Sequence, residues 1–347
     1  MRAEKLDLYR EYPQPDEESV AQSIVALMQS QMIENSRPGR TLRDVHSKHH
    51  GCVRGYFLVD PDLPEELRVG VFETPRRYHA WIRFSNSGAF APVGGVASDF
   101  KRDARGMAIK LLDVPGEKLL EDERDATTQD FLLFTPKMFF TAGPGDFHNL
   151  MIALTTHKLA MLWYLITHPA VALALYRSLK KHGNVLELQY YSAVPYAFGS
   201  KAAKYSAKPQ RPRATPLPHR PTDKFLRERM IHDLAESDVS FDFMVQLQTD
   251  PYVMPIENGL AVWNEALSPF RKVATLVIPK QQFDSPEQRQ CCENSSFTPW
   301  HSLPEHRPLG ALNRVRRIVY QKISEFRHLR NGQPRREPAG VEPCAQK

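Results

Sequence analysis

Residues 80–85 read Ala-Trp-Ile-Arg-Phe-Ser, a stretch in which residue types alternate over the length of one β-strand. On a strand, Ile82 and Phe84 share one face, whereas Arg83 and Ser85 share the other. If Arg83 and Ser85 face the inside of a barrel, they need a buried anion or polar partner, because an unpaired buried charge is costly. The alternative is that their face is exposed to water.

Short stretches with the same pattern lie on either side of this one. They are residues 53–59, 107–112 and 131–134, punctuated by Gly88, Gly94, Gly95 and Gly116. This spacing is typical of antiparallel strands in a curled sheet or barrel. Residues 241–248 and 274–279 resume the strand pattern. We therefore expect an α+β fold with an antiparallel β-barrel core and surrounding helices.

The composition of the 347-residue chain is that of a folded globular protein. Its 41% hydrophobic and 25% charged residues exclude disorder over the whole length and a small disulfide scaffold. The formal net charge of +6 is a mild excess for this length and is not a nucleic-acid signature. No segment near the N-terminus resembles a secretory signal, so we expect a cytoplasmic protein.

The chain divides into three parts. Residues 1–39 are expected to form an arm and an amphipathic helix, residues 40–330 one domain, and residues 331–347 a disordered tail. Within the domain, residues 147–182 have the character of a helical insertion. Residues 207–222 are rich in proline and arginine, which favours an extended connection.

The insertion contains an unusually apolar stretch, residues 159–176. Its length would just reach across a bilayer, but His168 and Pro169 interrupt it and Lys158 and Arg177 flank it. A buried helical hairpin is the simpler interpretation. A surface that touches a membrane or guides a lipid is the alternative.

The chain has four cysteines, Cys52, Cys291, Cys292 and Cys344, and none belongs to a Cys-x-x-Cys pair. A zinc ribbon or a thioredoxin-type site is therefore not indicated. The adjacent Cys291 and Cys292 could bridge each other only with strain, so we interpret them as free thiols in a reducing compartment.

Two clusters of polar residues could carry chemistry. In residues 43–51, His46 and His50 would share a face only in a helix, and Gly51 followed by a strand argues against one; a metal site and a polar loop both remain open. Near the other end of the chain, helical spacing places Arg316, Tyr320 and Arg327 in one stripe. Such a stripe could hold a phenolate between guanidinium groups, or it could be a solvated basic face.

Several stretches resemble motifs of haem catalases, in the same order along the chain. They are Arg-x-x-His-x-Lys at residues 43–48, Arg-Phe-Ser at 83–85, the run 102–110, the run 131–140, the segments 190–192 to 204–206, the run 297–304, and Arg-x-x-x-Tyr at 316–320. Together they cover about residues 40–330. The short catalase-related haem peroxidases resemble this chain most closely. The resemblance implies a catalase-like barrel with a wrapping loop.

The resemblance also implies roles for individual residues. His46 matches the distal histidine, and Ser85 matches the serine that orients it. Tyr320 matches the tyrosinate that ligates the haem iron, and Arg316 the arginine that keeps it ionised. The implied haem-binding residues are Arg43, Arg83 and Arg327, at propionate positions or flanking the proximal helix, and Phe139 or Phe140, stacked on the porphyrin.

The sequence departs from the family pattern at the distal asparagine. Where the family reads Asn-Asn-Thr-Pro, we align Thr127-Thr128-Gln129-Asp130, so that Gln129 or Thr128 substitutes for the amide only partly. An insertion around His49 and His50 adds an imidazole near the expected pocket mouth. Both departures argue against efficient dismutation of hydrogen peroxide.

The expected function is that of a haem b peroxidase in which His46 moves the peroxide proton from the inner to the outer oxygen. We expect reduction of organic hydroperoxides by a small-molecule electron donor and weak dismutation of hydrogen peroxide. One alternative is rearrangement of fatty-acid hydroperoxides on the same fold, as in coral allene oxide synthase. Another is a non-enzymatic protein that binds nucleic acid or an anionic membrane through residues 314–336; we expect no nucleic-acid partner. Lipid contact and homo-oligomerisation stay open.

Overall fold

The computed structural model describes residues 6–36, 39–88, 98–335, 337–338 and 340. Gly94, Gly95 and Cys344, which were singled out above, lie outside these ranges, as do residues 341–347 of the tail.

The strands close into a barrel, as the alternating pattern predicts. The first four are β1 (His49–Val59), β2 (Arg77–Asn86), β3 (Arg105–Leu112) and β4 (Thr128–Phe134), and the others are β5 (Tyr190–Tyr191), β6 (Tyr196–Phe198), β7 (Lys201–Pro209), β8 (Val239–Leu247) and β9 (Arg271–Ile278). All pairings are antiparallel, in the order β5-β4-β3-β2-β1-β9-β8-β7-β6. Because β5 also pairs with β7, eight strands form a closed ring to which β6 is added.

Apolar side chains fill the barrel. Phe57, Phe84, Phe131 and Phe243 are fully buried in one core cluster, and the rings of Phe57 and Phe243 lie 5.0 Å apart in an edge-to-face arrangement. Since side chains alternate along a strand, Arg83 faces the outside of the barrel. Of the two alternatives for Arg83 and Ser85, the inward-facing one is therefore excluded. Both are nevertheless buried, at 4% and 3% exposure, because loops and helices cover the outer surface of β2.

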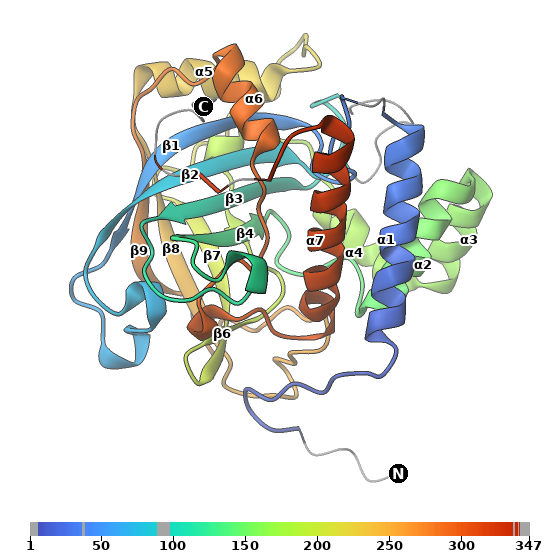
Figure 1. The fold of residues 1–347 in the computed structure, drawn as a ribbon, viewed down its shortest axis with the longest axis horizontal. Helices are drawn as coiled ribbons and strands as arrows, with labels where there is room; N and C mark the ends of the chain where they lie inside the picture. Colours follow the sequence, from blue (N-terminus) through green and yellow to red (C-terminus); the bar gives the residue numbers. More distant parts are fainter. Residues whose placement is uncertain (1–5, 37–38, 89–97, 336, 339, 341–347) are drawn as a thin grey trace.

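Two long helices lie side by side along one flank of the barrel, α1 (Glu17–Glu34) and α7 (Ala311–Asn331) (Figure 1). Ile24 of α1 and Val315 and Val319 of α7 share one apolar cluster, which holds the pair together. The helices α5 (Phe225–Glu236) and α6 (Pro286–Asn294) cover the end of the barrel drawn uppermost in Figure 1. Short 3₁₀ turns connect several elements, at Glu65–Leu67, Gly70–Phe72, Glu121–Glu123, Val185–Glu187 and Pro304–His306.

The predicted helical insertion consists of α2 (Pro144–Thr156), α3 (Lys158–Thr167) and α4 (Pro169–Ser178). In Figure 1, α2 and α3 lie on the far side of α1 from the barrel, and α4 is seen between α7 and α1. Among the described helices, none alone is long and apolar enough to cross a membrane; α3 and α4 together meet that criterion by length and composition, but they are bent by 109° at His168. Of the predicted extended connection, residues 207–209 belong to β7 and residues 210–222 form neither helix nor strand.

Two described residues of the predicted tail contact the barrel. Glu337 reaches the outer surface of the barrel, where its carboxylate lies 2.6 Å from the buried ammonium of Lys110. Trp81 donates a hydrogen bond from its indole nitrogen to the carbonyl oxygen of Gly340 at 3.1 Å. Lys110 thus faces two carboxylates, those of Glu337 and Asp130.

Candidate active site

His46 lies in the loop before β1, not in a helix, and is held over the outer surface of β2. Its backbone adopts φ 57°, a left-handed conformation that non-glycine residues adopt rarely and often at functional sites. Its amide donates to the carbonyl oxygen of Ser87 at 2.8 Å, and its ring Nδ1 lies 3.0 Å from Ser85 Oγ. The predicted contact between His46 and Ser85 is therefore present, and it leaves Nε2 available for a second partner.

Gly106 provides the floor beneath the imidazole. It pairs with Ser85 across β2 and β3, and a Cβ at this position would lie 2.7 Å from both Nδ1 and Cε1 of His46. Carbon atoms do not approach ring atoms this closely. The ring can therefore rest against β3 only because residue 106 has no side chain.

The surroundings of His46 keep its imidazole neutral. Burial, followed by the charges of Arg83 and Arg316, lowers the pKa of His46 to about 3. A neutral imidazole can accept a proton throughout the physiological pH range. The arginines whose charges lower this pKa come from three elements: Arg43 from loop 40–48, Arg83 from β2 and Arg316 from α7. These three elements therefore meet around the imidazole of His46.

Three arginines from different elements surround one carboxylate, that of Glu293 at the end of α6. Arg43 lies 3.0 Å from this carboxylate, and Arg327 lies 3.6 Å from it. Arg83 donates to the carbonyl oxygen of His46 at 2.8 Å, and Glu293 offsets part of the repulsion between Arg83 and the other two guanidinium groups. Burial and the charge of Arg43 lower the pKa of Arg327 to about 9.

The charges in this arginine cluster do not cancel. Among the described residues, three guanidinium groups face the single carboxylate of Glu293, which leaves two positive charges in excess. The Nε of Arg83 is also buried and has no hydrogen-bond partner among the described residues. A ligand with two carboxylates would neutralise this excess, and the two propionates of haem have this charge.

Tyr320 and Arg316 form the predicted pair on α7. The Arg316 guanidinium donates to the Tyr320 oxygen at 3.1 Å and to Asn313 Oδ1 at 2.9 Å. The contact between Arg316 and Tyr320 is a hydrogen bond with a cationic donor. The buried hydroxyl of Tyr196 faces the same guanidinium, which partly opposes the rise in the Tyr196 pKa caused by burial.

Aromatic rings line the region beside His46. Gly106 of β3 pairs with Ser85 of β2 on one side and with Phe134 of β4 on the other. The side chains of Phe134 and Ser85 therefore lie on the same, outer face of the barrel. The Phe134 ring lies 6.2 Å from that of Phe139 and 5.7 Å from that of Phe140. Phe139 also lies 5.4 Å from Phe147 of α2. Phe139 and Phe140 therefore extend the aromatic group that begins at Phe134.

Thr128 and Gln129 do not lie at this site, and their predicted roles require correction. They begin β4 and pair with Leu112 and Leu111, at the end of the strand opposite Phe134. Gln129 accepts a hydrogen bond from the Leu303 amide at 3.0 Å, and Thr128 donates to Glu337 at 2.8 Å. The β4 residue in line with Ser85 and Gly106 is Phe134. A phenyl ring therefore occupies the β4 position beside His46.

His49 and His50, which were expected near the pocket mouth, bind other residues of the protein. His50 is fully buried, with Nε2 2.8 Å from Asn86 Oδ1, and His49 lies against Arg227 at 3.1 Å. A separate cluster, Glu123, His301 and Glu337, has the residue types of a metal site. Lys110 and Arg335 pair with its carboxylates, which supplies the positive charge that a metal would bring.

Cys52 and Cys292 form a disulfide between β1 and α6, with Cα atoms 5.6 Å apart. The prediction that Cys292 is a free thiol is therefore wrong, and the cysteine argument for a reducing compartment does not hold. The two residues are 240 positions apart in sequence, so only the fold reveals the pairing. Since Glu293 follows Cys292 directly, this disulfide also ties the arginine cluster to the barrel.

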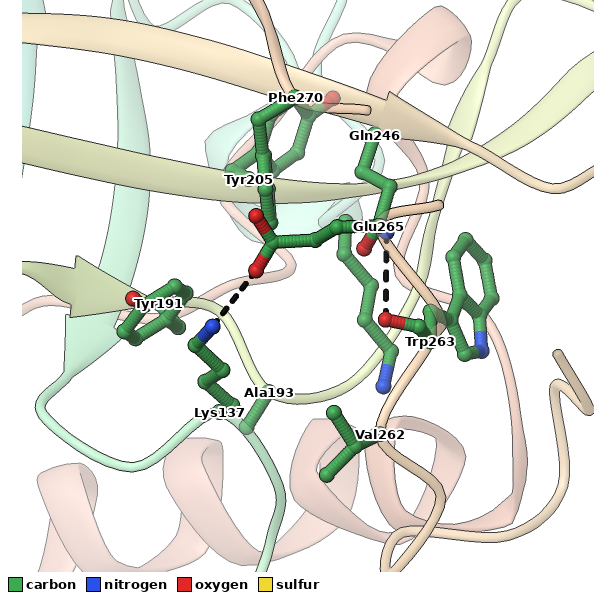
Figure 2. A pocket seen from close by; sticks show the side chains of 10 residues that line it. Lys137, Tyr191, Ala193, Tyr205, Gln246, Val262, Trp263, Glu265 and Phe270 are labelled. Carbon is green, nitrogen blue, oxygen red and sulfur yellow. Dashed lines mark hydrogen bonds and ion pairs between the residues drawn. The ribbon is translucent and has the colours of Figure 1, made fainter. Parts of the chain in front are cut away.

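A small pocket lies outside the arginine cluster (Figure 2). Tyr191, Trp263 and Phe270 line it, and a salt bridge of 2.6 Å between Lys137 and Glu265 spans it. Neither His46 nor Tyr320 contributes to this cavity.

Comparison with solved structures identifies the fold that the closed barrel and its flanking helices form. A fungal catalase aligns with a TM-score of 0.65 and 16% identity, over 82% of this chain and 59% of that one. Catalase A from Saccharomyces cerevisiae aligns with a TM-score of 0.62 and 18% identity, over 82% and 61%. A bacterial catalase aligns with a TM-score of 0.62 and 15% identity, over 88% and 63%.

The chain therefore has the catalase fold, as the order of its motifs predicts. It spans about three fifths of the length of each of these catalases. A scan against protein-family models and a search of curated proteins give no match.

Proposed function

We propose that the protein is a haem-dependent enzyme that cleaves hydroperoxides, with organic hydroperoxides as its main substrates, a small-molecule electron donor as reductant and only weak dismutation of hydrogen peroxide. The observation that carries this proposal is that α7 lies close to the imidazole of His46. Arg316 of α7 donates a hydrogen bond to Tyr320, and the charge of the same arginine lowers the pKa of His46. An ionisable oxygen donor and a neutral base thus share one region of a catalase fold.

The residues present fit haem b. Arg43, Arg83 and Arg327 would hold its propionates beside Glu293, and Tyr320 would ligate its iron. When bound, the haem iron would bind the peroxide as a Lewis acid and supply the electrons that break the O–O bond.

The protein's own groups would manage the proton. Ser85 holds His46 through Nδ1 at 3.0 Å, so Nε2 is the atom that would accept the proton of a bound hydroperoxide. Burial keeps the imidazole neutral before this step, and the nearby arginines disfavour retention of the proton. His46 would therefore return it readily to the departing oxygen, which would leave as water or an alcohol.

Phe134 supports the preference for organic peroxides over dismutation. A phenyl ring cannot donate a hydrogen bond to a bound peroxide, as an amide at the same strand position could. With Phe139 and Phe140 it forms an apolar wall that suits an alkyl group.

The basic helix face does not favour a nucleic-acid partner. Arg314 pairs with Glu11, Glu17 and Glu257, and Arg327 pairs with Glu293. These ion pairs within the protein neutralise both arginines. The two side chains therefore cannot replace counterions on the phosphates of a nucleic acid.

The test is the absorption spectrum of the purified full-length protein reconstituted with haem, compared with that of Tyr320→Phe. We expect a Soret band with charge-transfer features of a phenolate ligand, and loss of those features in the variant. His46→Ala should keep the spectrum and lower peroxide turnover by about 10²- to 10⁴-fold. No haem uptake, or equal turnover by His46→Ala, would refute the proposal; a rearranged product formed without a reductant would instead assign the hydroperoxide isomerase reaction.

A further inference from the structure

The outer face of the α3–α4 hairpin exposes large apolar side chains. On α3, Leu159, Leu162, Trp163 and Ile166 have the spacing i, i+3, i+4, i+7 and are 73%, 55%, 68% and 63% exposed. On α4, Tyr176 is 71% exposed. Soluble proteins rarely expose a contiguous apolar surface of this kind, which usually marks an interaction site.

The hairpin is anchored by its opposite face. Tyr164, Val171 and Leu175 are buried in an apolar cluster with Phe140 and Leu150, and Tyr164 donates a hydrogen bond to the carbonyl oxygen of Asp146 at 2.9 Å. The exposed residues therefore cannot turn inward without breaking this cluster. In Figure 1, α3 lies at the edge of the molecule on the far side of α1 from the barrel.

The charged residues within the hairpin and directly after it are cations. No aspartate or glutamate occurs between Asp146 and Glu187. Lys158 begins α3, Arg177 lies near the end of α4, and Lys180 and Lys181 follow α4; all four are exposed. Lys181 lies over the Phe100 ring at 3.6 Å, and no salt bridge joins any of the four to a carboxylate of a described residue. The neighbouring loop adds Arg102, whose guanidinium lies 5.9 Å from the Tyr176 ring.

We propose that the outer face of the α3–α4 hairpin docks the protein on the surface of an anionic phospholipid bilayer. Leu159, Leu162 and Ile166 would enter the acyl boundary, with Trp163 and Tyr176 at the level of the headgroups. The four cations would contact the phosphates. The 109° bend and the buried inner face fit a hairpin that lies on the membrane rather than one that spans it.

Flotation with lipid vesicles tests this proposal on the full chain. Vesicles of phosphatidylcholine with about one third phosphatidylglycerol should bind the protein, and added salt should weaken binding. Trp163→Ala/Ile166→Ala should reduce the partition coefficient by about tenfold or more, and Lys180→Glu/Lys181→Glu should abolish the preference for anionic over neutral vesicles. The matched control, Val253→Ala/Leu267→Ala, removes two side chains that are 49% and 53% exposed elsewhere and should bind normally.

Tryptophan fluorescence gives a second readout. Of the four tryptophans, Trp81, Trp263 and Trp300 are buried, so a blue shift on vesicle binding and quenching by brominated lipid would report on Trp163. Absence of vesicle binding, or equal binding by Trp163→Ala/Ile166→Ala, would overturn the proposal. Self-association that the same variant abolishes, without vesicle binding, would assign the face to a second copy of the chain. These measurements do not depend on peroxide turnover.

Discussion

Gly106 lies directly beneath the ring of His46, so close that a Cβ at position 106 would approach the imidazole to 2.7 Å. We expect Gly106→Ala to push the ring away from Ser85 and to lower peroxide turnover by about 10²-fold, since a misplaced base loses its reach to the substrate. Steady-state kinetics and the haem spectrum measure this. The matched control is Gly145→Ala, where nothing lies within 4 Å of the added Cβ. Normal turnover by Gly106→Ala would show that His46 does not act from the observed position.

On the proposed function, we expect Phe134→Asn to increase oxygen release from hydrogen peroxide. The new amide would stand in register with Gly106 and Ser85 and could donate a hydrogen bond to the peroxide, a contact worth about 1 kcal/mol or about fivefold in rate. An oxygen electrode gives the readout, with Leu132→Asn, two residues away on the same face, as control. Equal rates in both variants would contradict this role of Phe134.

The disulfide between Cys52 and Cys292 should stabilise the fold by about 2–5 kcal/mol, because it closes a very long loop in the unfolded chain. Cys52→Ser and Cys292→Ser should each lower the free energy of unfolding by that amount, and the double variant by no more than either one. Urea unfolding without reductant measures all three. If the two single effects add up in the double variant, the cysteines are not linked.

Acid should destabilise the protein between pH 6.5 and pH 3. Burial lowers the pKa of His306 to about 3, whereas the unfolded histidine titrates near 6.5. In this window the unfolded state binds the additional proton, so stability falls as the pH falls, by about 1.4 kcal/mol per pH unit for each such histidine. His46 and His50, with pKa values also lowered to about 3, should add to the slope.

His306→Gln tests the contribution of one histidine. The neutral ring accepts a hydrogen bond from the Val71 amide at 3.1 Å and contacts the Tyr205 hydroxyl at 3.0 Å, and glutamine can offer an acceptor and a donor in their place. Urea unfolding at pH 7 and pH 5.5 should show a shallower pH dependence for the variant. An unchanged slope would mean that His306 does not titrate on unfolding in this range.

Local sequence patterns predicted the strands of the barrel and one contact in the candidate site, whereas the roles assigned to its residues came from the resemblance to haem catalases. Alternation at residues 80–85 gave β2, and the spacing of Arg316 and Tyr320 gave a contact within one helix, because both depend only on backbone geometry. The alignment of Gln129 with the distal amide failed, since residue type was matched without strand register. Register depends on pairing with β3, which a single sequence does not display.

Contacts between distant parts of the chain were also beyond sequence reasoning. No sequence motif pointed to Glu293, because it matters only through its ion pairs with Arg43 and Arg327, which are distant from it in sequence. Likewise, nothing in a polar tail indicates that Glu337 neutralises Lys110 inside a buried network. A search for carboxylates able to offset the predicted arginine cluster is the one signal that could have drawn attention to Glu293.

The candidate site joins a loop that precedes the barrel to a helix that follows it. His46 lies before β1, Tyr320 lies on α7 after all nine strands, and Arg314 of α7 pairs with Glu11 and Glu17 ahead of β1. On the proposed function, a barrel that has closed without α7 would hold the base but not the oxygen donor, so docking of α7 would be the step that completes the haem site.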